Sequence, residues 1–281
     1  MNTVLSIAGS DCSGGAGIQA DLKTIGAFGV YGMSVITAIT VQNTCGVYRV
    51  QPVDAGIVSE QLHAVWEDIP PDAVKIGMVA TAENVTAIAS VLGKHPAPLV
   101  LDPVLLSTSG KELLNNRAAE ALMEKLFPLA AVLTPNLPES EYLWGSPIAS
   151  RRDRERAAEQ LSERYGCSVL IKGGHGDAAD DFLFVSETGT RHWYCKEKIE
   201  NPNTHGTGCT LSSAIACGLA EGLTLPESVQ VAKDYITGAI RDGMDLGRGN
   251  GPLNHFWNMS VGGRAVPSYK KEDYHGFQYK K

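Results

Sequence analysis

The stretch Asn203-Thr-His-Gly-Thr-Gly-Cys-Thr210 joins strand-like sequence over 191–199 to an apolar, helix-like run that begins at Leu211. The first backbone N–H groups of a helix have no partner within the helix and carry partial positive charge. Two glycines let the backbone approach an anion closely, so this segment can hold a phosphate. The same field favours a thiolate, and we expect a lowered pKa for the Cys209 thiol. A glycine-capped helix start with a small buried cysteine is the alternative interpretation.

Composition excludes several classes of protein. The chain has 281 residues, of which 43% are hydrophobic, and a formal net charge of −7, which argues against a general nucleic-acid binder. We see neither a signal peptide nor an apolar run long enough to span a membrane. The six cysteines form no CxxC pair, which argues against zinc and favours reduced thiols. We therefore expect a cytoplasmic protein that binds neither nucleic acid nor a membrane.

Strand-like and helix-like segments alternate along the chain. The strand-like segments are 3–8, 34–41, 73–78, 99–102, 131–134 and 168–172, followed by 181–186 and 191–199, which we expect to form a hairpin. The helix-like segments are 17–28, 54–68, 82–92, 115–126, 152–165, 211–223 and 226–246. This order predicts an α/β fold, a doubly wound and mostly parallel sheet flanked by helices, with a small lid or edge hairpin. We expect one domain over 1–260 and a polar C-terminal tail over 261–281.

Glycines and polar residues follow the predicted strands. In doubly wound sheets ligands bind beyond the carboxyl ends of the strands, so these motifs should meet in one crevice. The motifs are Gly9-Ser-Asp11, Gly77-Met78, Asp102-Pro-Val104, Asn136 and Lys172-Gly-Gly-His175. The first of them opens a stretch with four glycines over 9–17, which we interpret as a ligand-binding loop after the first strand, although Asp11 and Ser13 could simply cap the next helix. It is not a P-loop, because the chain contains no GxxxxGK[ST].

Several polar side chains are candidates for binding, each with a simpler alternative. Gln42 offers a donor and an acceptor side by side, suited to the edge of a heterocycle, but could be a polar strand end. Asp102 and the pair Asn136/Glu139 supply oxygen ligands typical of Mg²⁺, although NxxE is also typical of a helix cap. A lysine at the end of a buried strand is costly unless an anion pairs with it, so Lys172 would bind a nucleotide phosphate. The alternative is that its side chain extends into solvent.

Taken together, these segments resemble the ribokinase-like superfamily and, within it, the hydroxymethylpyrimidine/phosphomethylpyrimidine kinases. The resemblance rests on the stretches 8–24, Lys75-Ile-Gly-Met78, Thr134-Pro-Asn-Leu-Pro-Glu139, Lys172-Gly-Gly-His175, 205–214 and Gly251-Pro-Leu-Asn-His255. It implies a bifunctional kinase of thiamine diphosphate biosynthesis. Such an enzyme uses ATP to phosphorylate 4-amino-5-hydroxymethyl-2-methylpyrimidine and then converts the monophosphate to the diphosphate.

The resemblance also assigns roles to individual residues. The implied catalytic residues are Cys209, as the base, with Gly206, Thr207 and Gly208 as an anion hole. Gln42 would read the pyrimidine, in a pocket lined by Asp21, Gly9, Met78 and Val104. Lys172, Asn136 and Thr207 would bind the nucleotide, and Glu139, Asn136 and Asp102 would organise Mg²⁺. The cofactors expected are ATP and Mg²⁺, with a monovalent cation left open, and we expect a homodimer.

Three alternatives stay open. One is a vitamin B6 (pyridoxal/pyridoxine) kinase that uses the same machinery. Some pyridoxal kinases of this group carry a second cysteine in the lid, and none occurs here between Cys45 and Cys167. The segment 103–110 also differs from the usual lid of the pyrimidine kinases. The other two alternatives are a cysteine hydrolase with Cys209 as nucleophile and His205 as base, and a non-catalytic pyrimidine-binding regulator.

Overall fold

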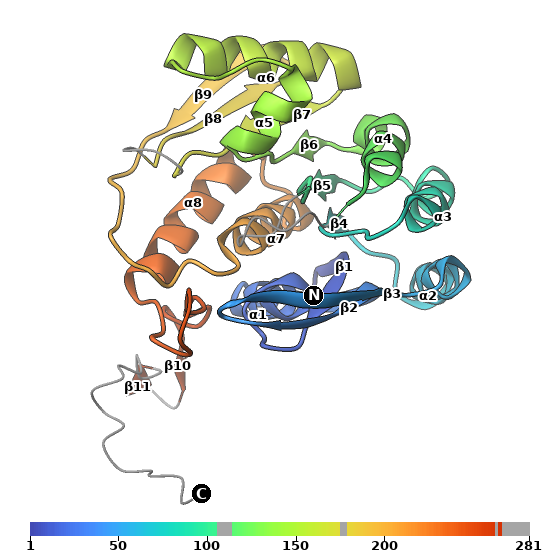
Figure 1. Cartoon of the computed structure of the whole chain (residues 1–281), viewed down its shortest axis with the longest axis horizontal. Coiled ribbons are helices and arrows are strands. Elements are labelled where there is room, and N and C mark those ends of the chain that lie inside the picture. Colours follow the sequence, from blue (N-terminus) through green and yellow to red (C-terminus); the bar gives the residue numbers. More distant parts are fainter. Residues whose placement is uncertain (106–113, 175–178, 262–263, 266–281) are drawn as a thin grey trace, which may run out of the picture.

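A nine-stranded sheet forms the centre of the computed structural model, which describes residues 1–105, 114–174, 179–261 and 264–265 (Figure 1). The order across the sheet is β3-β2-β1-β4-β5-β6-β7-β8-β9. The strands are β1 (Thr3–Asp11), β2 (Tyr31–Asn43), β3 (Gly46–Pro52), β4 (Ala73–Ile76), β5 (Leu99–Leu101), β6 (Val132–Leu133), β7 (Ser168–Ile171), β8 (Asp181–Val185) and β9 (Thr190–Tyr194). The strands from β2 to β7 are parallel, and an antiparallel hairpin lies at each edge. The predicted α/β, mostly parallel fold is therefore confirmed.

The chain reverses its winding direction at β1. It runs outward from β1 to β2 and β3, and then returns to place β4 on the other side of β1. The parallel register aligns Thr3 with Tyr31 of β2 and Val4 with Ala73 of β4, so the carboxyl ends of these strands share one edge. A crevice opens at such a reversal, and this is where ligands bind in doubly wound sheets.

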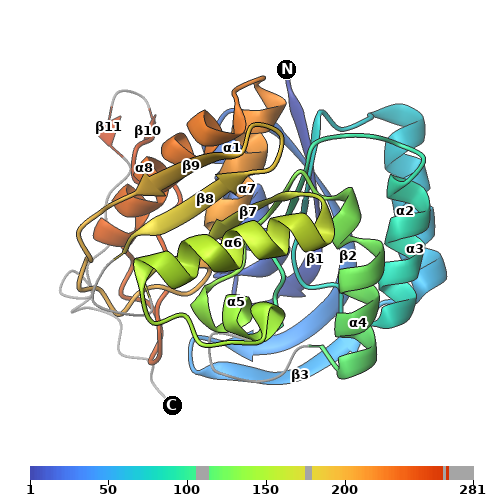
Figure 2. The same cartoon turned by 90° about the horizontal axis from the view of Figure 1, so that it is seen from above.

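Helices cover both faces of the sheet (Figure 2). One layer holds α1 (Gly17–Ala27), α7 (Thr207–Ala220) and α8 (Leu225–Arg241). The other holds α2 (Ala55–Asp68), α3 (Ala82–Leu92), α4 (Asn116–Lys125), α5 (Leu137–Trp144) and α6 (Arg151–Tyr165), with a short 3₁₀ turn at Phe127–Leu129. Alternate side chains of β1 serve the two cores: Val4 packs with the first layer, whereas Leu5 and Ile7 pack with the second.

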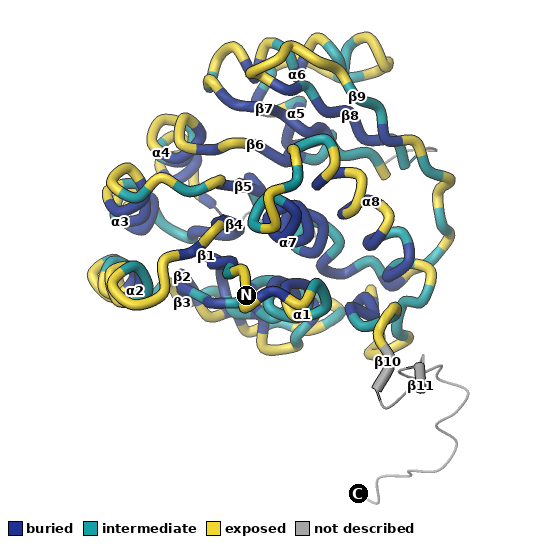
Figure 3. Tube along the Cα trace, turned by 180° about the vertical axis from the view of Figure 1, so that it is seen from behind, coloured by how far each residue is buried: buried dark blue, intermediate teal, exposed yellow. Residues whose placement is uncertain are grey.

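Burial separates the central helix from the outer ones. Figure 3 shows α7 dark blue along most of its length, and the apolar run from Leu211 to Gly218 is buried. In α6 the buried residues are confined to one stripe, which contains Ala157, Ala158 and Leu161. The sequences fit these positions, because a helix enclosed on all sides is apolar all round and a surface helix is apolar on one side only.

The structure corrects several predicted boundaries. β1 continues through Gly9 to Asp11, so the ligand-binding loop begins later than expected. The pairing of β1 with β2 shifts register between Ala8 and Ser10, which is inside the strand. β9 ends at Tyr194 rather than at residue 199, because its partner β8 begins at Asp181, opposite Tyr194. α7 begins at Thr207, four residues earlier than the apolar pattern indicates. β3 and α5 were not predicted as elements.

The hairpin predicted around the turn 187–190 is confirmed as β8–β9. A small two-stranded sheet pairs β10 (Ser260–Val261) with β11 (Arg264–Ala265). Most of the expected tail over 261–281 lies outside the described residues. In the described parts of the chain, no helix combines the length and apolar character needed to cross a membrane.

Candidate active site

A cavity of about 990 Å³ lies at the carboxyl ends of the parallel strands. Its lining includes every site residue inferred from the sequence except one. Those that contribute to the wall are Gly9, Gln42, Met78, Asp102, Val104, Asn136, Glu139, Lys172, Gly206, Thr207, Gly208 and Cys209. Residues from opposite ends of the chain therefore meet in one crevice, as the order of segments predicts.

The exception is Asp21, which we expected in the substrate pocket. Its side chain is fully buried beneath the cavity, where both carboxylate oxygens lie 2.8 Å from the Lys75 ammonium. Ser6 and Ser213 each donate a further hydrogen bond to it. The expectation that Asp21 contacts substrate is wrong for this structure, because every oxygen lone-pair direction is already taken by the protein.

The start of α7 is built to meet an anion. Its N-cap, Gly206, has φ 88°, and a Cβ there would lie 1.9 Å from the Gly15 carbonyl oxygen, so only glycine fits. Among the described residues no side chain caps α7, whereas α3 and α5 are capped by Thr81 and Asn136. The Thr207 N–H bonds the Thr204 carbonyl oxygen at 3.3 Å, so the start of α7 is closed by backbone rather than by a capping side chain. A glycine-rich helix start without a capping side chain, at a cavity wall, is the arrangement of helix-terminal phosphate sites.

The environment of Cys209 differs from the expectation in one respect. Burial raises the pKa of the Cys209 thiol above its usual range, although the Lys75 ammonium lowers it and Asp21 raises it further. The Gly17 backbone N–H also donates to the sulfur and lowers the pKa. The predicted lowering is wrong for this structure, because the helix field and Lys75 act on a thiol that the floor of the cavity shields from water.

A charged cluster lies beside the α7 start. Lys172 Nζ is 2.5 Å from Asp102 Oδ1, and Thr134 Oγ1 donates to the same oxygen at 3.1 Å. Burial raises the pKa of Glu139 to about 7, with Lys172 opposing the shift and Asp102 adding to it. The parallel bridge between Asn136 and Lys172 explains the grouping, because it joins the ends of β6 and β7.

Asn136 and Glu139 form a complete helix cap. Asn136 Oδ1 accepts from the Glu139 N–H, and Glu139 Oε2 accepts from the Asn136 N–H, both at 2.9 Å. The capping interpretation of this motif is therefore confirmed, and the side chains also line the cavity. Within the described residues, no group of three or more His, Cys, Asp or Glu side chains could hold a metal ion unaided.

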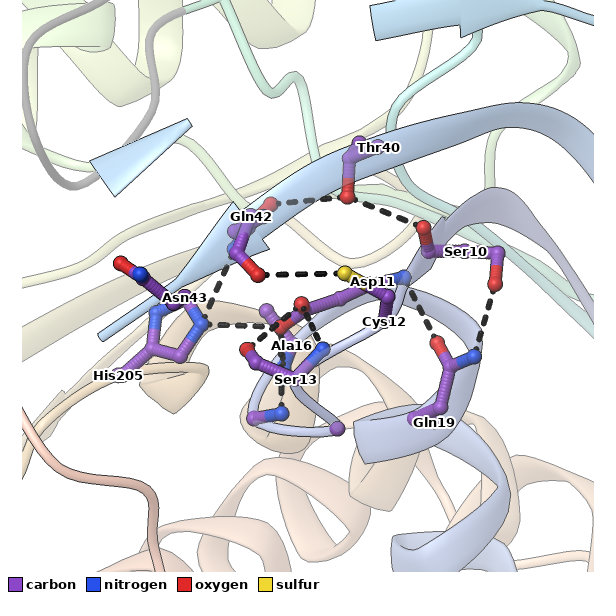
Figure 4. A network of polar contacts seen from close by, with 12 residues as sticks. Ser10, Asp11, Cys12, Ser13, Ala16, Gln19, Thr40, Gln42, Asn43 and His205 are labelled. Carbon is purple, nitrogen blue, oxygen red and sulfur yellow. Dashed lines mark hydrogen bonds and ion pairs between the residues drawn. The ribbon is translucent and has the colours of Figure 1, made fainter. Parts of the chain in front are cut away.

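A second polar network joins the glycine-rich loop to the α7 loop (Figure 4). Asp11 Oδ2 accepts from the Ala16 N–H at 2.9 Å and lies 3.0 Å from His205 Nε2. The same ring nitrogen is 3.1 Å from the Gln42 amide, whose other atom lies 3.1 Å from Thr40 Oγ1. Asp11 thus holds the loop that precedes α1, and among the described residues no side chain caps this helix, so the alternative in which Asp11 is its cap is not confirmed. The contact with His205 adds a link that the spacing of the two motifs does not reveal.

Sequence reasoning missed the far end of the cavity. The segment 196–202 and one face of α8 form this wall, and α8 contributes Lys233, Ile236, Thr237 and Ile240. The spacing of Ile236 and Ile240 by four residues is a helical signal, but ordinary core packing produces the same pattern. Only the position of α8 against the open segment after β9 makes these residues part of a site.

A glycine-rich helix start without a side-chain cap, a lysine and buried carboxylates meet at the reversal point of a doubly wound sheet, and together they define a ribokinase-like phosphotransferase. The chain belongs to the phosphomethylpyrimidine kinase family, whose family model matches residues 11–254. The family assignment made from the sequence is therefore confirmed.

Three relatives show how close the match is. The hydroxymethylpyrimidine/phosphomethylpyrimidine kinase of Rhizobium meliloti is 51% identical over 257 residues, which cover 90% of this chain and 96% of that protein. Phosphomethylpyrimidine kinase from Clostridium difficile, known from a crystal structure, is 47% identical in sequence, with a TM-score of 0.76. The match covers 85% of this chain and 100% of that chain. Bacillus subtilis pyridoxal kinase, whose structure is known as an ADP complex, is 37% identical in sequence, with a TM-score of 0.82. The match covers 91% of this chain and 97% of that chain.

Proposed function

We propose that this protein uses ATP to phosphorylate 4-amino-5-hydroxymethyl-2-methylpyrimidine and then its monophosphate, which yields the diphosphate used in thiamine diphosphate biosynthesis. The observation that carries the proposal is that the uncapped start of α7, Gln42 and Lys172 share one cavity. Gln42 would offer a donor and an acceptor to the ring edge, and Gly9, Met78 and Val104 line the same cavity.

At the phosphate end, the α7 N–H groups of Gly206, Thr207 and Gly208 would stabilise the transferred phosphoryl group. Lys172, Asn136 and Thr207 line the route to the far end of the cavity, where Ile236 and Ile240 offer an apolar surface to a nucleobase. Phosphoryl transfer depends mainly on positioning and on neutralisation of charge, and these groups supply both. The ADP bound by the Bacillus subtilis relative supports a nucleotide in this region.

The carboxylates fit a magnesium ion that keeps its waters. Asp102 and Glu139 are buried at the cavity wall close to Lys172, a sparse oxygen set that suits an ion also held by nucleotide phosphates. Asp102, Glu139 and Asn136 would hold Mg²⁺, which would neutralise charge on the phosphates. A monovalent cation stays an open possibility.

Cys209 is the proposed base for the substrate hydroxyl. Because burial raises the pKa of this thiol, only a small thiolate fraction exists near neutral pH, and that fraction grows about tenfold per pH unit. We expect kcat to rise from pH 7 to pH 8.5 in the wild type. Cys209→Ala should lose most of the turnover and Cys209→Asp should flatten the rise, since its carboxylate is already ionised. Steady-state rates against pH test this, and near-normal turnover of Cys209→Ala would refute the assignment.

The alternative activity is that of a vitamin B6 kinase, which the similarity to the Bacillus subtilis pyridoxal kinase favours. The absence of a second cysteine between Cys45 and Cys167 and the higher identity to the pyrimidine kinases favour the pyrimidine. Mass spectrometry of products formed from Mg-ATP with either the pyrimidine or pyridoxal decides between them. Phosphate on pyridoxal alone would overturn our choice, and phosphate on neither would favour the non-catalytic regulator.

The contacts of His205 do not favour a cysteine hydrolase. His205 Nε2 lies against Asp11 and Gln42, whereas the Cys209 sulfur accepts from the Gly17 N–H. A hydrolase would need the histidine to take the proton of the thiol.

A homodimer stays a prediction, supported by the edge hairpin β2–β3. Ile39, Val41 and Tyr48 of this hairpin are 55%, 52% and 60% exposed, and apolar side chains on an exposed sheet edge are commonly covered by a partner. A cytoplasmic location likewise stays a prediction.

A further inference from the structure

We propose that Asp11, His205 and Thr40 are positioning residues that hold the Gln42 carboxamide in one orientation, with its oxygen toward His205 and its NH₂ group toward Thr40. This inference rests on the proposed function of Gln42 as the reader of the pyrimidine. The structure places the two atoms the other way round, with Nε2 toward His205 and Oε1 toward Thr40. Because the oxygen and nitrogen of an amide have nearly the same shape, the hydrogen-bond partners at its two ends decide which atom lies where.

The first end of the amide meets His205 Nε2. That nitrogen lies 3.0 Å from Asp11 Oδ2 and 3.1 Å from the amide, and one ring nitrogen cannot donate to the first and accept from the second. Burial alone would raise the pKa of Asp11, but hydrogen bonds from His205, Ser13 and Ala16 lower it to about 2, so the carboxylate is ionised. An ionised carboxylate requires a proton on Nε2. An amide oxygen can share that proton with Asp11, whereas an NH₂ group there would set two donors against each other.

The second end of the amide meets Thr40 and gives the same answer independently. The Thr40 hydroxyl lies 3.0 Å from the Ser10 carbonyl oxygen and 3.1 Å from the atom placed as Gln42 Oε1, so in this placement two acceptors compete for its one proton. A hydroxyl has one proton, and a carbonyl can only accept, so Thr40 donates to Ser10. The amide atom beside Thr40 must then be the donor, which is the NH₂ group. Figure 4 shows Gln42 between these two partners, with its amide oxygen drawn toward Thr40 and with Asp11 on the other side of the bonded His205 nitrogen.

The loop geometry keeps His205 in place. A Cβ at Gly15 would lie 2.3 Å from His205 Cδ2, so the ring packs directly on the glycine-rich loop whose amides Asp11 also holds. His205 is buried, with 8% of its surface exposed, and immediately precedes the Gly206 N-cap of α7. The orientation of the amide is therefore tied to the phosphate-binding loop.

The consequence concerns the substrate. With one N–H used by Thr40 and one oxygen lone pair used by His205, Gln42 presents one N–H and one lone pair, at fixed ends, to a ligand in the cavity it lines. A 4-aminopyrimidine has the complementary pair side by side, a ring nitrogen that accepts and an amino group that donates. The ring nitrogen should lie on the Thr40 side and the amino group on the His205 side.

Steady-state kinetics test the positioning role. Thr40→Val and Asp11→Asn keep the side-chain shapes but free the amide to rotate, and we expect each to raise KM for the pyrimidine about tenfold, the value of roughly one hydrogen bond, with KM for ATP changed less than twofold. In a Gln42→Ala background Thr40→Val should add less than twofold. Asp54→Asn, at the exposed N-cap of α2, is the matched control for Asp11→Asn. Full multiplication of the effects in the double variant, or an unchanged KM in Thr40→Val, overturns the proposal.

NMR of the wild-type protein without substrate separates this inference from the proposed function. We expect the ¹⁵N spectrum to show His205 protonated at Nε2, and nuclear Overhauser contacts from the Gln42 NH₂ protons to the Thr40 methyl rather than to the His205 ring. Contacts to the ring instead would refute the orientation even if the enzyme phosphorylates the pyrimidine. A correct orientation in a protein that makes no phosphorylated pyrimidine would refute the substrate instead.

Discussion

Two lysine–aspartate pairs lie near the carboxyl ends of strands of the same sheet, and they differ in what surrounds them. Lys75 of β4 bonds both oxygens of Asp21 at 2.8 Å, and neither side chain is exposed. Lys172, after β7, bonds one oxygen of Asp102 at 2.5 Å, and their side chains are 12% and 4% exposed. The same chemistry thus occurs once in closed protein and once at the wall of the cavity.

The two pairs differ in the hydrogen-bonding capacity that their side chains have left for a ligand. Ser6 and Ser213 complete the hydrogen bonds of Asp21, so the carboxylate of the first pair has no lone pair left for a ligand. In the second pair Asp102 Oδ2 points toward the start of α7, where a Cβ at Gly208 would lie 3.2 Å from that oxygen. A buried ion pair contributes little net stability, because desolvation of the two charges offsets their attraction. Removal of one partner is nevertheless costly, because it leaves the other charge buried and unpaired. The closed pair should therefore matter most for folding and the open pair most for catalysis.

The largest effect should come from Lys75→Met. The Asp21 carboxylate would lose the Lys75 ammonium, with which it forms an ion pair in fully enclosed surroundings, so we expect the free energy of unfolding to fall by about 3–5 kcal/mol. Urea denaturation followed by circular dichroism measures it. Lys75→Met combined with Asp21→Asn removes the stranded charge and should recover part of the loss. A loss below about 1 kcal/mol would contradict the structural role of this pair.

Lys172→Met should act on turnover instead. Removing a cation that faces developing charge on the phosphates should lower kcat/KM by about a hundredfold to a thousandfold. Its urea midpoint should fall less than that of Lys75→Met, because Asp102 faces the cavity and can be solvated there. The comparison between the two pairs fails if Lys172→Met is the less stable variant and retains most of its activity.

Glu139 adds a pH dependence to the open pair. Its pKa is raised to about 7 by burial, so the folded protein holds this proton more tightly than the unfolded chain between about pH 4.5 and pH 7. The free energy of unfolding should therefore decline as pH rises through this window, by on the order of 1–3 kcal/mol. Glu139→Gln should lack this part of the decline. Urea midpoints at pH 5, 6, 7 and 8 measure the difference, and parallel curves for the two proteins would refute it.

The smallest effect belongs to an exposed pair with a short contact. Arg191 and Glu159 are 2.7 Å apart, with side chains 56% and 32% exposed. Because water already solvates both ions, Arg191→Met should change the free energy of unfolding by less than about 1 kcal/mol. A loss comparable to that of Lys75→Met would show that distance rather than enclosure decides the contribution of such pairs.

Much of the fold and of the site could be predicted from local sequence. Apolar runs with glycines and polar residues at their ends mark parallel strands and their carboxyl ends, and Gln42, Asp102, Lys172 and Cys209 all lie where this pattern places them. Asp21 could not be placed in this way, because an aspartate on a helix looks the same in sequence whether it faces a ligand or a buried lysine 54 residues away.

Apart from β3 and α5, the sequence alone determined the element types, their alternation and the glycine-rich helix start, since these depend on backbone propensity and on apolar periodicity over short distances. Only the tertiary structure decided which charges are enclosed, that burial raises the pKa of Cys209, and that Asp11 meets His205 across 194 positions of the chain. Solvation and hydrogen-bond partnership depend on which segments the fold brings together, and no spacing along the chain encodes that directly.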